Sequence, residues 1–223
     1  MIGKPNAENN FLYLTTALLV LLLALPLLAT FPQGPVHWII RGLIIATLLV
    51  TYFSLDFGYW WGKFVLLVMF LLIISSVVRQ FYPAYSTNST HLVLLLLFFC
   101  SVAYSAGHRV LLRDEINHNR IIGSIAIYLL LGLIWSMLYL LLLEIEPTAI
   151  RGIEYRPWEE NFFDITYFSF VTLTTLGYGD ITPVHPGSSA LAYLQAITGP
   201  FYMAVVVASL VGRKTQSQTP ATH

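Results

Sequence analysis

The 223-residue chain has few charged residues and a single cysteine, and both shortages limit what it can be. Charged side chains make up 10% of the sequence, whereas 57% of the residues are hydrophobic. Soluble domains average about 25% charged residues. Eleven basic residues balance eleven acidic ones, so there is no positive surplus for nucleic acid. Cys100 alone allows no internal disulfide and no cysteine metal cluster. The composition excludes an ordinary soluble domain or a disordered chain and predicts an integral membrane protein.

Stretches without charge indicate where the membrane helices lie. A spanning helix needs about 20 mostly apolar residues. Four uncharged stretches have that length, and two shorter ones reach it with aromatic residues at the interface. Runs such as Leu18–Leu25 do not alternate apolar and polar residues as barrel strands do. We therefore predict an all-α membrane protein with six transmembrane helices and no cleaved signal peptide. The expected helices span residues 11–31, 37–55, 61–80, 91–112, 121–143 and 189–212.

Six helices would place both chain termini on the same side of the membrane. Seven of the eleven lysines and arginines fall on that side. Basic residues accumulate in cytoplasmic loops, so we expect both termini to be cytoplasmic.

The stretch between the fifth and sixth helices, residues 144–188, carries the most specific pattern. It contains a semi-apolar run, Asn161–Leu173, that is too short to span a membrane. That run leads directly into Thr174-Thr175-Leu176-Gly177-Tyr178-Gly179-Asp180. We predict a half-helix followed by an irregular loop at membrane depth. Such a backbone is tolerated only where it lines a cavity.

Dehydration of a cation gives this loop a physical purpose. A cation entering a pore loses water and needs substitute oxygens, which consecutive backbone carbonyls supply if they all face the axis. This requires backbone angles that glycine tolerates, which explains Gly177 and Gly179. Thr175 adds its hydroxyl oxygen, while the side chains of Leu176 and Tyr178 are expected to point away and pack the loop. The expected K⁺ ligands lie at Thr175, Leu176, Gly177 and Tyr178.

The segment Thr172–Pro183, which reads TLTTLGYGDITP, resembles the selectivity filter of the potassium channel superfamily. The resemblance implies a filter over 175–179, with Leu176 in place of the usual valine. It further implies that Tyr167 and Phe168, which stand where many members have two tryptophans, form an aromatic cuff around Tyr178. Thr174 and Asp180 complete the expected filter support. The leucine-rich style and spacing are similar to those of compact bacterial channels.

Oligomeric state and gating follow from the same pattern. One chain supplies one filter strand, so a closed ring of carbonyls requires four copies, and we expect a homotetramer with three identical partner subunits. Proline after glycine removes a helix hydrogen bond, so Gly199-Pro200 is expected to bend the sixth helix. The resemblance places Gly199 at a hinge of the inner helix. A static kink is the alternative.

The first four helices do not resemble a voltage sensor. A sensor needs several basic residues on the fourth helix, which here carries only Arg109 near its end. The expected organisation is a peripheral module over 1–112, a cytoplasmic connector over 113–120, a pore domain over 121–212 and a cytoplasmic tail over 213–223. We expect no soluble regulatory domain.

Taken together, the sequence predicts passive, K⁺-selective conduction through a tetramer in the cell membrane, with the bacterial inner membrane as the expected location. The protein would contact membrane lipids and need no cofactor besides the permeant K⁺. A weakly selective cation channel and a non-conducting partner subunit are the alternatives. A membrane enzyme is disfavoured, because the six histidines are scattered along the sequence without metal-binding spacing.

Overall fold

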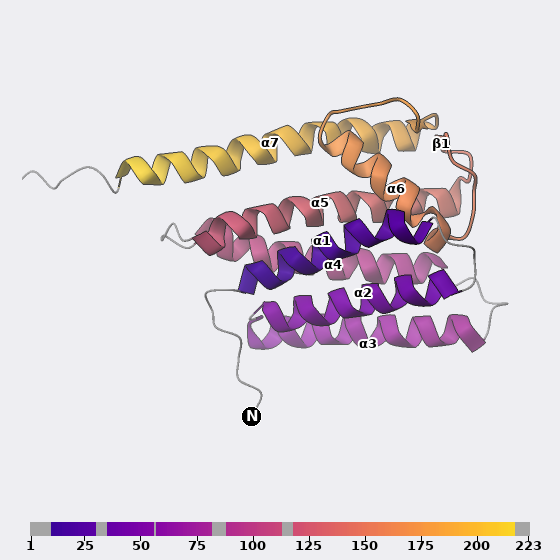
Figure 1. Cartoon of the computed structure of the whole chain (residues 1–223), viewed down its shortest axis with the longest axis horizontal. Coiled ribbons are helices and arrows are strands. Elements are labelled where there is room, and N and C mark those ends of the chain that lie inside the picture. Colours follow the sequence, from indigo (N-terminus) through magenta and orange to yellow (C-terminus); the bar gives the residue numbers. More distant parts are fainter. Residues whose placement is uncertain (1–9, 30–34, 56, 82–87, 113–117, 217–223) are drawn as a thin grey trace, which may run out of the picture.

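The computed structural model describes residues 10–29, 35–55, 57–81, 88–112 and 118–216, which form seven helices and two short strands (Figure 1). In chain order these are α1 (Asn10–Ala29), α2 (Pro35–Ser54), α3 (Tyr59–Phe81), α4 (Asn88–Leu112), α5 (His118–Ile145), β1 (Ile150–Arg151), α6 (Trp158–Leu173), β2 (Thr182–Pro183) and α7 (Pro186–Gln216). The predicted helical architecture is confirmed.

Four helices have the length and composition to cross a membrane. They contain the apolar stretches Tyr59–Val78, Asn88–Val110, Asn119–Ile145 and Pro186–Ser209. Helices α1 and α2 are also apolar, over the shorter stretches Asn10–Pro26 and Gly42–Ser54. The chain therefore has the helices of a multi-pass membrane protein.

Helix α5 lies at the centre of the molecule and packs against α1, α4, α6 and α7. Its inner face carries Leu130, Leu133 and Met137, which are fully buried. Helix α2 packs against α1, and α3 packs against α4. The long helices run lengthwise through the molecule, whereas the shorter α6 crosses them obliquely beside α5 and α7 (Figure 1).

The two ends of the bundle differ in what they carry. The start of α1 and the end of α7 lie at one end, as an even number of lengthwise helices requires (Figure 1). Strands β1 and β2 and the start of α6 lie at the opposite end. From there α6 runs toward the middle of α7, and the chain after it returns to β2 at the end where α6 began.

The observed ends of several helices differ from the predicted ones. Helix α6 begins at Trp158, three residues before the predicted Asn161. Helix α5 begins at His118, so the last residues of the predicted connector 113–120 are helical, and 113–117 lie outside the described residues. Helix α7 continues to Gln216 and includes the first residues of the predicted tail 213–223. Residues 217–223 of that tail lie outside the described part.

Candidate functional site

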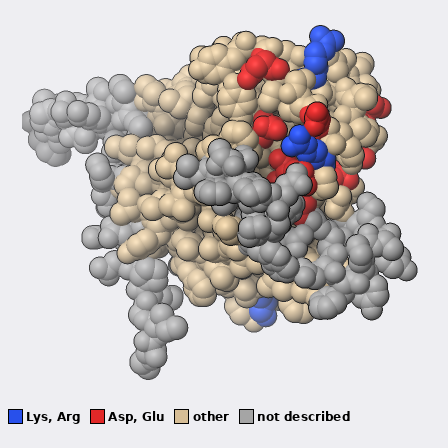
Figure 2. All heavy atoms as spheres, turned by 45° about the vertical axis from the view of Figure 1, so that its right-hand side comes forward, with Lys and Arg blue, Asp and Glu red and all other residues tan. Residues whose placement is uncertain are grey.

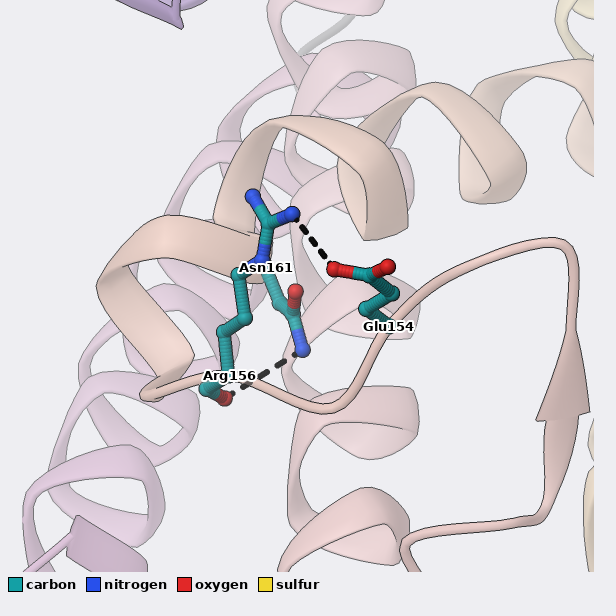
Figure 3. A network of polar contacts seen from close by, with 3 residues as sticks. All are labelled: Glu154, Arg156 and Asn161. Atoms are coloured by element: carbon teal, nitrogen blue, oxygen red, sulfur yellow. Dashed lines mark hydrogen bonds and ion pairs between the residues drawn. The ribbon is translucent and has the colours of Figure 1, made fainter. Parts of the chain in front are cut away.

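The start of α6 is fixed by the loop that precedes it. The amide Nδ2 of the buried Asn161 donates a 3.3 Å hydrogen bond to the carbonyl oxygen of Arg156, two residues before the helix (Figure 3). The Arg156 guanidinium forms a 2.7 Å ion pair with Glu154. The backbone N–H of Glu160 donates to the carbonyl oxygen of Pro157 at 2.9 Å and closes the first turn. These contacts set the position from which α6 points inward.

Acidic residues gather around this end of the molecule. Residues 144–180 contain seven aspartates and glutamates but only two arginines, and Figure 2 shows the acidic side chains on this face. Glu159 and Glu160 lie in the first turn of α6, where the positive end of the helix dipole stabilises negatively charged side chains. The excess of acids makes this surface attractive to cations.

The chain turns sharply after Leu173, and its N–H groups bond back to α6. The N–H of Thr174 donates to the carbonyl oxygen of Phe170, and that of Thr175 donates to Thr172, each at 3.0 Å. The N–H groups of Leu176 and Gly177 both donate to the carbonyl oxygen of Val171, at 2.9 and 3.4 Å. The helix end therefore satisfies the donors of the first part of the loop.

The backbone angles of the loop alternate. Thr175, Gly177 and Gly179 have positive φ values of 58°, 58° and 83°, whereas the intervening Leu176 and Tyr178 do not. A backbone that alternates in this way sets successive N–H groups on one side and carbonyl oxygens on the other. Within the described part of the chain, no hydrogen bond ends on a carbonyl oxygen of residues 175–179. The loop thus presents a row of acceptors without donors.

Asp180, directly after this row, is held by the predicted support residue Tyr167. The Tyr167 hydroxyl donates a 2.7 Å hydrogen bond to Oδ2 of Asp180. That bond holds the pKa of Asp180 below its ordinary value of 3.8. It also raises the pKa of Tyr167 to about 12, because it favours the protonated phenol beside the carboxylate. Asp180 is therefore an ionised carboxylate at the C-terminal end of the loop.

The two aromatic residues of the predicted cuff have separate partners within one chain: Tyr167 bonds to Asp180, and Phe168 packs against α5. Phe168 is buried, and its ring packs against Tyr139 of α5 with the ring centroids 4.9 Å apart. Phe168 thus fixes α6 to α5, and the described ring contacts do not join it to Tyr178. The side chains of Leu176 and Tyr178 are 55% and 67% exposed in the single chain, and their predicted packing around the loop stays a prediction. Thr174 bonds back to the carbonyl oxygen of Phe170 through Oγ1, at 2.8 Å.

The C-terminal end of the loop is tied to the segment after α5. Strands β1 and β2 are antiparallel neighbours, with Arg151 opposite Thr182. Gly152 has a φ of 95°, and a side chain there would collide with the carbonyl oxygen of Asp180. The hydroxyl of Ser188, at the start of α7, donates a 2.6 Å bond to the carbonyl oxygen of Ala149. Sequence reasoning missed Gly152, although a glycine in a polar loop is a common sign of a tight backbone contact.

The predicted hinge residues lie where α7 crosses the end of α6. A methyl group at Gly199 would collide with the carbonyl oxygen of Leu173. The hydroxyl of Tyr128 reaches the same oxygen at 3.4 Å. Gly199 therefore permits close contact between α7 and the last turn of α6, a role that the hinge prediction did not include. Pro200 lies inside the continuous helix α7 and is exposed.

Sequence reasoning also missed three polar side chains in the core. Tyr139 of α5, Ser169 of α6 and Gln195 of α7 are fully buried and joined by hydrogen bonds. The only sequence signal was a glutamine in the apolar sixth helix. Such a residue signals a buried polar contact, but it does not identify the partners.

Comparison with known proteins adds one match. Residues 124–215, which include most of α5 and nearly all of α7, match the family model described as "Ion channel". No curated protein and no solved structure matches the chain. The family match supports an ion channel of the potassium-channel type and so favours a transport function over an enzymatic one. The apolar helices support a multi-pass membrane protein.

Proposed function

We propose that the chain forms a homotetrameric, K⁺-selective channel whose filter is residues 175–179. The observation that carries the proposal is the row of carbonyl oxygens without donors beside N–H groups that bond to α6. Carbonyl groups at membrane depth need a partner, because hydrocarbon offers none. A dehydrated cation is such a partner, and rings of carbonyls are how K⁺ channels replace the hydration shell.

Four copies of the chain are needed to close such a ring. Each chain supplies one loop, and cyclic symmetry about the pore places the four loops around one axis. The exposed side chains of Leu176 and Tyr178 lie on this loop, and neighbouring copies would cover them. Helix α7 adds further exposed apolar residues, namely Tyr193, Leu194, Ile197, Phe201, Met203, Val205 and Val207. In the tetramer these would face another subunit, the pore or lipid.

The permeation path in this proposal runs from the acidic end of the molecule through the filter to α7. The acidic surface concentrates cations, and Asp180 adds a fixed negative charge at the outer mouth. The C-terminus of α6, which is the negative end of its helix dipole, points toward the cavity below the filter in this proposal. A cation is therefore stabilised before, within and after the filter. No covalent bond is made or broken, and K⁺ moves down its electrochemical gradient.

The proposal includes a membrane arrangement. Helices α1 and α2 join the four longer helices as spans, the acidic end faces outward and both termini are cytoplasmic. The excess of basic residues on the side of the termini supports this orientation. The cell membrane, and specifically the bacterial inner membrane, is the proposed location.

Ion flux through the purified protein tests the function. The protein is reconstituted in liposomes, and the reversal potential is measured with K⁺ on one side and Na⁺ on the other. Gly177→Ala is compared with Gly107→Ala, since both glycines have open space around Cβ but only Gly177 has a positive φ. An alanine at positive φ costs about 1–2 kcal/mol. We expect K⁺ selectivity in the parent and in Gly107→Ala, and its loss in Gly177→Ala.

Two results would contradict the proposal and identify an alternative. Equal passage of K⁺ and Na⁺ through the parent would indicate a weakly selective cation channel. Well-assembled protein that passes neither ion under any applied voltage would indicate a non-conducting partner subunit.

A further inference from the structure

A chain of buried hydrogen bonds joins the three helices of the pore domain. The Tyr139 hydroxyl of α5 donates a 2.8 Å bond to Oε1 of Gln195 on α7. Nε2 of Gln195 donates to the carbonyl oxygen and to Oγ of Ser169 on α6, at 2.9 and 2.8 Å. The Ser169 hydroxyl then donates a 2.7 Å bond to the carbonyl oxygen of Gly132 on α5. All three side chains are 0% exposed.

Both the carbonyl oxygen and the NH₂ group of the Gln195 side chain take part in the network. The amide oxygen accepts one bond, and the NH₂ group has two acceptors on Ser169. A buried amide without such partners costs free energy, and a fully bonded network favours a single arrangement of its members. Sliding or rotating α6 relative to α7 would break these bonds. The amide of Gln195 therefore fixes the relative position of the two helices.

Close contacts at two glycines, made by residues that follow Ser169 on α6, limit this helix further. The Phe170 ring lies against Gly132, where a side chain would overlap it. One turn later, the carbonyl oxygen of Leu173 lies against Gly199. Gln195 and Gly199 are one turn apart on α7 and contact α6 at Ser169 and Leu173. Helix α6 is thus held by the network and by direct contact immediately before the filter begins.

We propose that Gln195, with Tyr139 and Ser169, positions the pore helix α6 for ion selection. This inference rests on the proposed channel function. The loop 174–177 is bonded to the carbonyls of the last turns of α6, so a shift of α6 moves the filter carbonyls with it. Selectivity depends on where those oxygens lie. Gln195 is a positioning residue, because it acts through α6 and touches no ion.

Two tyrosines of the pore domain, Tyr139 and Tyr202, provide a matched comparison. Tyr139→Phe removes one hydroxyl from the network. Tyr202→Phe removes the hydroxyl that donates a 2.7 Å bond from α7 to the carbonyl oxygen of Ser124 on α5. Each substitution deletes one oxygen from a helix-to-helix bond, but only Tyr139 belongs to the network that reaches α6. A purely structural effect would be similar for both.

The test measures the K⁺-to-Na⁺ permeability ratio of the reconstituted full-length protein, with tetramer content and thermal stability measured on the same samples. We expect Tyr139→Phe and Gln195→Leu to lower the ratio by about fivefold or more, the equivalent of one net hydrogen bond. Tyr202→Phe should leave the ratio unchanged. If Gln195→Leu does not assemble, Tyr139→Phe, which removes a single atom, decides the question.

The outcomes separate this inference from the function on which it rests. A K⁺-selective parent whose ratio is the same in Tyr139→Phe overturns the positioning role of the network and leaves the channel proposal intact. An equal loss of selectivity in Tyr139→Phe and Tyr202→Phe also overturns it, because the effect would then be general loosening. A parent without K⁺ selectivity overturns the proposed function and the inference together.

Discussion

The hydroxyl of Tyr167 donates a 2.7 Å hydrogen bond to the carboxylate of Asp180, joining the middle of α6 to the residue directly after the proposed filter. The two residues lie on either side of the loop, so their bond ties the end of the loop to α6. The bond also keeps Asp180 ionised by lowering its pKa. A single contact thus influences both the position and the charge of Asp180 at the end of the loop.

Removing this bond should make the channel more sensitive to external acid. In Tyr167→Phe the pKa of Asp180 rises toward its ordinary value, so the carboxylate takes up a proton at a higher pH than in the parent. Loss of the negative charge reduces the local cation concentration. We expect K⁺ flux to fall at a higher external pH in the variant, measured between about pH 3 and 6. Tyr155→Phe, an exposed tyrosine at the same end, should match the parent. Identical acid midpoints in Tyr167→Phe and the parent would count against this role.

Gly152→Ala should displace Asp180, at the end of the proposed filter, although the two residues are far apart in sequence. The added methyl group would collide with the carbonyl oxygen of Asp180, and the φ of 95° at Gly152 is unfavourable for alanine. Backbone strain alone costs about 1–2 kcal/mol there, and the displaced Asp180 carries the filter with it. We expect lower thermal stability and a reduced K⁺-to-Na⁺ permeability ratio, whereas Gly58→Ala, with open space around it, should affect neither. Normal selectivity in Gly152→Ala would show that the contact does not constrain the loop.

Substitutions at Gly199 and Pro200 should separate packing from bending. Gly199→Ala forces α7 away from Leu173, and overpacking of this kind costs about 1–3 kcal/mol. We expect it to lower stability and selectivity. Pro200→Ala restores a helix hydrogen-bond donor without adding bulk at α6. If the segment is a hinge, Pro200→Ala changes the open probability in single-channel recordings and leaves the permeability ratio unchanged. Unaltered opening in Pro200→Ala would favour a static kink.

Phe168→Ala should be among the most destabilising substitutions in the pore domain. The ring is buried against Tyr139, and removing a buried phenylalanine ring costs about 3–5 kcal/mol. We expect a large fall in the thermal midpoint of the reconstituted protein. Phe70→Ala, at an exposed position on α3, serves as the control. Equal midpoints for the two variants would contradict the assigned packing of Phe168.

The helices and the loop that follows α6 were predictable because their causes are local. Uncharged apolar stretches form helices whatever they pack against, and the glycines at 177 and 179 require positive φ in this loop. The start of α6 was placed too late, because Trp158-Glu159-Glu160 is a polar-looking segment in sequence. Acidic residues are in fact favoured in the first turn of a helix.

The contacts between helices were not predictable, because they join residues far apart in sequence. The identity of Phe168 does not tell whether its ring faces the filter or α5. Gln195 gives a sign of a buried polar contact, but Tyr139 and Ser169 become its partners only through the crossing of α5, α6 and α7. Close contacts at Gly132 and Gly199 likewise depend on which helix lies opposite.

The most direct test of the account is whether ions touch the carbonyl groups of the filter. The sequence contains two Leu-Gly pairs, Leu131-Gly132 in α5 and Leu176-Gly177 in the filter. Labelling leucine with ¹³C at the carbonyl and glycine with ¹⁵N therefore gives two carbonyl signals in solid-state NMR spectra of the membrane-embedded protein. Exchange of K⁺ for Na⁺ should shift the Leu176 carbonyl signal and leave that of Leu131 in place. A Leu176 signal that does not respond to the exchange would contradict the assignment of residues 175–179 as the ion-coordinating filter.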